Sequence, residues 1–148
     1  MKKFTGLPVM LGFLFSVAFF TSASPGIISE EEAGGKVLSV HQLNLKEGVN
    51  VAEFEAFILN DLLPYYNKVK GQKGNLAKGD RGIRTGKYAI ILSFDSLADR
   101  NRIYPPEGGL SDEFEEILKG TEDLWDKLGS FVEGDAFGNH TDYVMILP

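Results

Sequence analysis

The chain has 148 residues and no cysteine, with 15 basic and 21 acidic side chains and a formal net charge of −6. The absence of cysteine excludes disulfides, thiolate metal sites and a cysteine nucleophile. The acidic balance argues against nucleic acid or an anionic lipid surface as a binding partner.

Residues 1–23 have the three-part pattern of a secretory signal. Lys2 and Lys3 precede a mostly apolar stretch from Leu7 to Phe20, and small residues follow. This stretch is shorter than the ~20 residues of a membrane-spanning helix. We therefore expect cleavage after Ala23, export to the periplasm or the medium, and no stable membrane insertion after cleavage. The remaining chain would carry 13 basic and 21 acidic residues, a net charge of about −8.

The rest of the chain divides into a leader and one domain. Residues 24–35 ("SPGIISEEEAGG") are acidic and glycine-rich, without apolar periodicity, and predict a flexible leader. Residues 36–148 are numerous enough for one compact domain with its own core.

The first half of this domain begins with a strand and a helix. Residues 36–45 are apolar at both parities, which predicts a strand. Helical spacing then runs to Tyr66, with Asn50 as the expected N-cap and Pro64 as a disruption of the last turn.

Two further strands follow, joined by a glycine-rich turn. The sequence predicts a polar strand after Gly71 and an apolar strand over 87–94. We attribute Gly79, Gly82 and Gly86 to positive φ angles in the turn between them.

The second half predicts an interrupted helix and a last strand. Ser96 is the expected cap of a short helix that ends at Tyr104, and "PPEGG" (105–109) interrupts it. A second helix starts at Ser111 or Asp112 and ends at Gly129, and residues 140–147 form a strand.

This order of elements is that of the ferredoxin-like βαββαβ fold, an α+β architecture with a four-stranded antiparallel sheet and two helices on one face. The inner strands are apolar on both faces, whereas an antiparallel sheet with one face in water alternates. The second face therefore needs cover, and we expect a homodimer joined through the sheet faces.

The segments "HQLNLKEGV", "GDRG", "GKYAIILSFDS" and "HTDYVMI" resemble the dimeric α+β barrel superfamily. That superfamily includes antibiotic-biosynthesis monooxygenases, EthD-like proteins and stress-responsive barrel proteins. The resemblance covers nearly the whole domain and implies a ferredoxin-like subunit that dimerises through its sheet. Members include oxygenases, isomerases, haem-degrading proteins and proteins without known activity. No subfamily's catalytic motif is present, so the resemblance implies no catalytic residue.

The segment "KGDRGIRTGK" (78–87) has the glycines and cations of a phosphate-binding loop without its spacing. The pattern G-x-x-x-x-G-K-[ST] requires glycine where Arg81 stands and a hydroxyl where Tyr88 stands. Lys87 also leads into a strand and not into a helix. We favour a hairpin turn, and the alternative is that Arg81 and Arg84 hold an anionic ligand by paired hydrogen bonds.

The two histidines stand on strands that are neighbours in a ferredoxin-like sheet. We expect position 41 to pair with about position 143, which separates His41 from His140 by ~10 Å and excludes a shared metal. Asp142 would then lie beside His41 and raise the pKa of its imidazole, as a general base requires. The alternative is a structural, hydrogen-bonded His41.

Aromatic residues provide a candidate apolar pocket, although at helical spacing such residues usually belong to the core. The aromatic candidates are Tyr65, Tyr66, Tyr104, Trp125, Phe131 and Phe137. The expected ligand-binding residues are Arg81, Arg84, Tyr104, Trp125, His140 and Tyr143.

Two functions follow from these features. The favoured one is an exported, non-catalytic homodimer that binds a small apolar or aromatic-acid ligand or supports an envelope process. The alternative is a cofactor-independent monooxygenase or isomerase, in which His41 and Asp142 move a proton and Arg81 or Arg84 holds the substrate anion. The sequence has no fingerprint for flavin, nicotinamide or haem, so we expect no cofactor and no metal.

Overall fold

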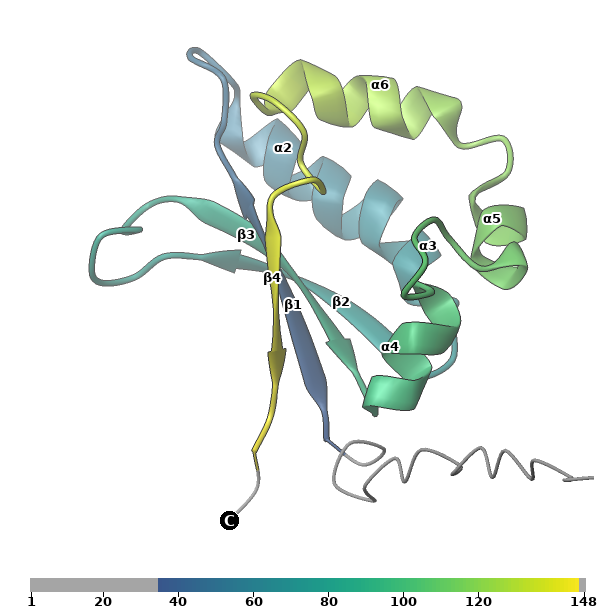
Figure 1. Cartoon of the computed structure of the whole chain (residues 1–148). Helices are drawn as coiled ribbons and strands as arrows, with labels where there is room; N and C mark the ends of the chain where they lie inside the picture. The colour runs from purple at the N-terminus through teal and green to yellow at the C-terminus, as the bar shows by residue number, and fades with distance from the viewer. Residues whose placement is uncertain (1–34, 147–148) are drawn as a thin grey trace, which may run out of the picture.

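The computed structural model describes residues 35–146 (Figure 1). The expected signal (1–23) lies outside these residues, as does all of the expected leader (24–35) except Gly35. The elements in chain order are β1 (Val37–Leu43), α2 (Val51–Phe57), η1 (Ile58–Leu62), α3 (Leu63–Tyr66), β2 (Gln72–Lys78), β3 (Tyr88–Phe94), α4 (Leu97–Ile103), α5 (Asp112–Leu118), α6 (Glu122–Phe131) and β4 (His140–Val144). Within the described part, none of the helices is long and apolar enough to cross a membrane.

The four strands form one antiparallel sheet in the order β2-β3-β1-β4, and the helices lie on one side of it (Figure 1). This strand order with the chain order βαββαβ is the ferredoxin-like α+β fold that the sequence predicts. Strands β1 and β3 are the central pair, so the side chains of β1 meet neighbours on both sides.

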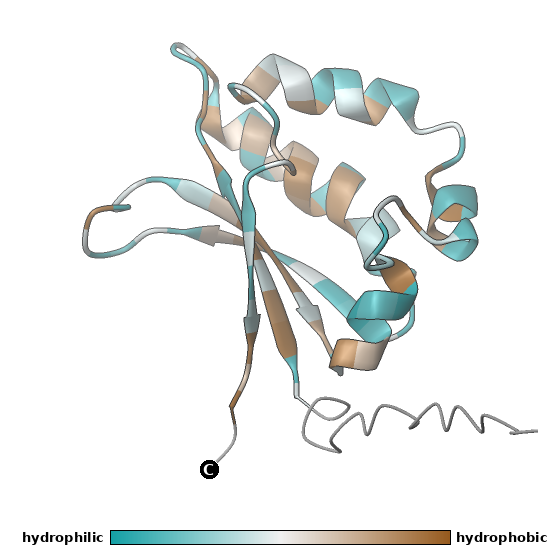
Figure 2. Cartoon of the chain, in the orientation of Figure 1, coloured by the Kyte–Doolittle hydropathy of each residue, from teal (hydrophilic) through white to brown (hydrophobic). Residues whose placement is uncertain are grey.

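The two faces of the sheet differ in burial. On the helix side of β3, Tyr88, Ile90, Leu92 and Phe94 are all buried. Figure 2 shows the apolar residues along β1 and along α2, which packs over the sheet. The opposite side, here called the open face, carries half-buried and exposed apolar residues: Leu38, Val40, Ala89, Ile91 and Tyr143. The prediction of apolar residues on both faces is therefore confirmed.

The first helical segment begins as predicted and changes geometry near Pro64. The side-chain oxygen of Asn50 accepts hydrogen bonds from two backbone N–H groups in the first turn of α2. Pro64 has no N–H to donate, and in the interior of a continuous α-helix its ring would clash with the carbonyl group four residues earlier. The chain takes the wider turns of a π-helix in η1, where the N–H of Leu63 donates to the carbonyl of Ile58. The helix then continues to Tyr66.

The helix predicted from Ser111 to Gly129 is in fact two helices, α5 and α6. Gly120 has a φ angle of 76° just beyond the end of α5, in the left-handed position where glycine is favoured. Gly129 lies inside α6, which ends at Phe131. A single apolar stripe predicted one helix because both pieces turn their apolar side chains toward the same core.

The hairpin between β2 and β3 confirms the turn interpretation of "KGDRGIRTGK". Gly82 and Gly86 have φ angles of 85° and 75°, as expected. The prediction of a positive φ at Gly79 is wrong. A Cβ atom at Gly79 would lie 1.9 Å from the carbonyl oxygen of Arg84, so glycine is needed there for the close approach of two backbone segments.

Candidate functional site

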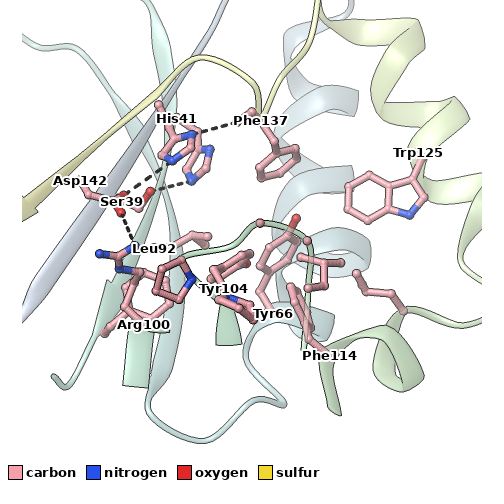
Figure 3. Close-up of a pocket in the computed structure, with 18 residues that line it drawn as sticks. Ser39, His41, Tyr66, Leu92, Arg100, Tyr104, Phe114, Trp125, Phe137 and Asp142 are labelled. Atoms are coloured by element: carbon pink, nitrogen blue, oxygen red, sulfur yellow. Dashed lines mark hydrogen bonds and ion pairs between the residues drawn. The ribbon is translucent and has the colours of Figure 1, made fainter. Parts of the chain in front are cut away.

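A cavity of about 490 Å³ lies between the sheet and the helical layer (Figure 3). Strands β1, β3 and β4 form one side of it, and α3 to α6 with the loops around Pro105 and Phe137 form the other. This volume lies within the range of small-molecule sites, which is roughly 300–1,000 Å³.

One part of the cavity is aromatic. The six rings that line it, here called the aromatic wall, belong to Tyr66, Phe94, Tyr104, Phe114, Trp125 and Phe137. Phe137 stacks on Tyr66 with ring centroids 5.7 Å apart and meets Trp125 edge-on at 5.8 Å. Burial raises the pKa values of Tyr66 and Tyr104 well above the usual range, so both phenols are uncharged at neutral pH.

The aromatic wall contains four of the six aromatic residues that the sequence nominated, including the expected ligand contacts Tyr104 and Trp125. The other two lie elsewhere. Phe131 packs against Phe54 and Phe57 in the core, and the Tyr65 ring lies under the ammonium group of a lysine.

The opposite part of the cavity is polar. The residues that line it, here called the polar end, are Ser39, His41, Arg100, His140 and Asp142. The β1–β4 register pairs His41 with His140 and Ser39 with Asp142. Residues paired across antiparallel strands point to the same face, so these four side chains meet on the helix side of the sheet. Helix α4 adds Arg100, which lies beside Asp142 (Figure 3).

This register corrects the predicted one. Position 41 pairs with 140 and not with about 143, and the imidazole rings are stacked with centroids 4.9 Å apart, where ~10 Å was expected. Among residues 35–146, no three His, Cys, Asp or Glu side chains are grouped closely enough to hold a metal ion.

The loop before β4 places Phe137 and His140. The carboxylate of Asp135 accepts a 2.9 Å hydrogen bond from the N–H of Phe137, and backbone hydrogen bonds lower the pKa of this carboxyl group. The carbonyl of Phe137 lies 3.1 Å from Nδ1 of His140. Because a carbonyl only accepts, Nδ1 of His140 is the donor in this contact.

His41 is a buried, uncharged histidine. The pKa of His41 is lowered from 6.5 to about 4, mainly by burial and also by the neighbouring His140, while Asp142 acts in the opposite direction. The prediction of a raised pKa is therefore wrong, because desolvation outweighs a carboxylate that does not bond to the ring. The Nε2 atom lies 3.0 Å from the hydroxyl oxygen of Ser39, and Nδ1 has no hydrogen-bond partner among the described residues.

Arg100 and Asp142 form the only pair of opposite formal charges among the residues that line the cavity. Their nearest atoms, Nη1 and Oδ2, are 3.6 Å apart. The Nε atom of Arg100 and Oδ1 of Asp142 are buried without a hydrogen-bond partner in the described part of the chain. Nε2 of His140 lies 3.9 Å from Oδ1, beyond hydrogen-bonding distance.

Ser39 and His41 are as close as a serine nucleophile and its general base. Their surroundings differ from those of a catalytic triad. In a serine triad, a carboxylate binds the second imidazole nitrogen and stabilises the imidazolium that forms. Nδ1 of His41 lacks such a carboxylate among residues 35–146, and its pKa of about 4 makes it a weak base at neutral pH. The arrangement is better suited to hydrogen bonding than to proton transfer.

Three predicted ligand contacts lie away from the cavity. Arg81 is almost fully exposed on the β2–β3 hairpin and pairs with Asp80, and Arg84 points toward the backbone of Leu43. Tyr143 is on the open face of the sheet, opposite Leu38. The expected anion clamp is therefore not part of this cavity.

Sequence reasoning missed Arg100 and Ser39 as cavity residues. Arg100 is one of two arginines in a short polar helix, and nothing in the spacing of "LADRNRI" separates it from Arg102. Ser39 shares the parity of His41 on β1, which was a usable signal for their contact.

Comparison with known proteins gives a fold-level likeness. The sequence matches no protein-family model and no curated protein. The chain is similar to the crystal structure of a dimeric protein of unknown function with a ferredoxin-like fold from Bacteroides fragilis NCTC 9343. The TM-score is 0.40 and the sequence identity 20%, over 75% of this chain and 97% of that chain.

The lowered pKa of His41 predicts a loss of stability in acid. Above pH 6.5 this histidine is neutral in both the folded and the unfolded chain and has no effect on the pH dependence. As the pH falls from 6.5 toward 4, the unfolded chain takes up a proton that the folded chain does not. Between pH 7 and pH 4.5 the wild type should therefore lose about 2 kcal/mol more stability than His41→Asn.

Urea unfolding of the wild type and His41→Asn at the two pH values measures this difference, because every other titratable group is present in both proteins. Equal losses in the two proteins would show that His41 is not desolvated in the folded chain.

Proposed function

We propose that this protein binds a small ligand with an aromatic or apolar body and a polar head in the cavity between the sheet and the helices. The observation that carries the proposal is the coincidence of three unpartnered polar atoms with the aromatic wall. His41, Arg100 and Asp142 line one end of the same cavity, and each has a buried polar atom without a hydrogen-bond partner among the described residues: Nδ1, Nε and Oδ1, respectively. Buried polar groups without partners are costly, and a ligand head that bonds to them would remove this cost.

Binding is favoured over catalysis by the state of His41. The oxygenase or isomerase alternative requires a general base with a pKa near the working pH. The pKa of His41 is about 4, and its carboxylate neighbour Asp142 faces Arg100 instead of the imidazole.

Trp125 gives a direct test of binding, since it is the only tryptophan of the chain and lines the cavity. N-Phenyl-1-naphthylamine is an uncharged aromatic probe that accepts energy from tryptophan emission. We expect saturable energy transfer from Trp125 to this probe at one site per chain. Leu118→Phe, which replaces a leucine side chain of the cavity lining by a larger aromatic one, should weaken binding at least about ten-fold, or 1.4 kcal/mol.

Ile117→Phe is the matched control, because Ile117 is the neighbouring residue on α5 and does not line the cavity. It should bind the probe like the wild type. No saturable transfer, or equal weakening by both substitutions, would contradict a ligand site in this cavity.

The open face of the sheet supports a second part of the proposal, a homodimer. Apolar side chains of β1, β3 and β4 lie on this face, and in the described part of the chain no helix covers it. A second copy would bring the same apolar surface and bury both, as a two-fold symmetric interface does.

Ile91→Asp tests the dimer, because Ile91 lies on the open face of the central strand β3. Burying an uncompensated carboxylate in an apolar interface is strongly unfavourable. We expect light scattering to give twice the chain mass for the wild type and a monomer or an unfolded chain for Ile91→Asp. Leu59→Asp is the control, since Leu59 is 53% exposed on the helical layer. A monomeric wild type, with mass and melting temperature unchanged in Ile91→Asp, would contradict the dimer.

Export completes the proposal and is supported by the sequence of residues 1–23 alone. Mass spectrometry of the protein from its native host should find an N-terminus at Ser24 in an extracytoplasmic fraction. Recovery of the uncleaved chain from the cytoplasm would contradict export.

A further inference from the structure

The formally charged side chains at the polar end of the cavity are one cation and one anion. Among the residues that line the cavity, Arg100 and Asp142 are its only arginine and its only carboxylate, and no lysine is present. Each of the two side chains is about one-quarter exposed, so their charges act in a partly desolvated setting where like charges repel strongly. The buried His41 and the two tyrosines of the aromatic wall add no charge at neutral pH.

The unpartnered atoms at this end can be satisfied only by a ligand that supplies both a hydrogen-bond donor and an acceptor. Nε of Arg100 can only donate, and Oδ1 of an ionised Asp142 can only accept. Nδ1 of His41 takes either role, depending on the tautomer set by its contact with Ser39. A head group that satisfies the first two atoms must therefore accept one hydrogen bond and donate another.

A charged head group, whether an anion or a cation, comes close to a cavity side chain of the same charge. A carboxylate that accepts from Arg100 comes close to Asp142, because the two side chains are only 3.6 Å apart. A cationic head that donates to Asp142 meets Arg100 in the same way. Both ions also lose their hydration in a cavity whose remaining lining is mostly apolar.

We propose that the cavity selects an uncharged aromatic ligand whose head both donates and accepts hydrogen bonds, as a carboxamide does, and discriminates against the corresponding acid and amidine. The carbonyl of such a head accepts from Arg100 while its N–H donates to Asp142. This inference rests on the proposed ligand-binding function and narrows it. It also replaces the aromatic acid that the sequence suggested, because the arginines nominated to hold the acid lie outside the cavity.

Three probes of the same shape test the head group: biphenyl-4-carboxamide, biphenyl-4-carboxylate and biphenyl-4-carboxamidine. Isothermal titration calorimetry of the wild-type protein at pH 7.5 compares a neutral, an anionic and a cationic head on one body. We expect the carboxamide to bind at least about ten-fold more tightly than either ion, which corresponds to 1.4 kcal/mol. A carboxylate or carboxamidine that binds as tightly as the carboxamide would overturn the proposal.

Removing the charge of Asp142 should shift the preference toward the anionic head. Asp142→Asn leaves Arg100 without its counter-ion, so the carboxylate should gain at least about ten-fold in affinity while the carboxamidine loses affinity. Asp126→Asn is the matched control, since Asp126 is exposed on α6, does not line the cavity and changes the net charge equally. Equal effects of the two substitutions on carboxylate affinity would count against the proposal. The comparison of probes on the wild type stands even if Asp142→Asn is poorly folded.

The outcomes separate this inference from the proposed function. If N-phenyl-1-naphthylamine binds and biphenyl-4-carboxamide does not, the head-group assignment is wrong and the cavity still binds ligands. If neither N-phenyl-1-naphthylamine nor any biphenyl probe binds, the ligand-binding function is wrong, and the head-group assignment is wrong with it.

Discussion

The pairing of β1 with β4 determines which polar side chains meet at the polar end of the cavity. Strand β1 is hydrogen bonded to β3 on one side and to β4 on the other, and its helix side carries both core residues and the polar pair Ser39 and His41. The register that sets His140 opposite His41 also sets Asp142 opposite Ser39. Because side chains alternate between faces, a shift of β4 by one or three residues would turn Asp142 to the open face and remove it from the cavity. The polar end therefore depends on one strand register.

The same pairing explains why the site favours hydrogen bonding over proton transfer. The helical layer encloses the paired side chains, so the imidazole of His41 is desolvated and its pKa falls to about 4. Arg100 reaches the cavity from α4 and takes the place beside Asp142 that a catalytic histidine would need. Two stacked imidazoles, one cation and one anion form a polar surface that carries one formal charge of each sign. Such a surface recognises a polar head group by its pattern of donors and acceptors.

Much of the fold follows from the sequence because local signals decide it. Asn50 and Ser96 cap helices as predicted, and apolar residues on both parities of β3 indicate a strand buried on the helix side and apolar on the other. The break at Gly120 was also local, since glycine at that position ends a helix in the left-handed conformation. It was missed because the apolar stripe continues across it.

The site was less predictable because it depends on contacts between distant segments. His41, His140 and Asp142 were nominated and do line one cavity, but their mutual geometry requires a register that spacing alone does not give. Parity offered a partial check: pairing 41 with 143 puts Asp142 on the opposite face from His41, so that register was inconsistent with their proposed contact. Arg100 joins through the packing of α4 over the sheet, which no local pattern encodes. The cations of the hairpin resembled an anion site in sequence, but Arg81 is exposed beside Asp80 and Arg84 points toward the backbone of Leu43.

A crystal structure of the protein with biphenyl-4-carboxamide tests the central claim most directly. We expect the biphenyl rings to lie against Trp125 and Phe137, with the carboxamide in hydrogen-bonding contact with Nε of Arg100 and Oδ1 of Asp142. Density for the compound only outside the cavity, or a carboxamide directed away from these two atoms, would contradict it.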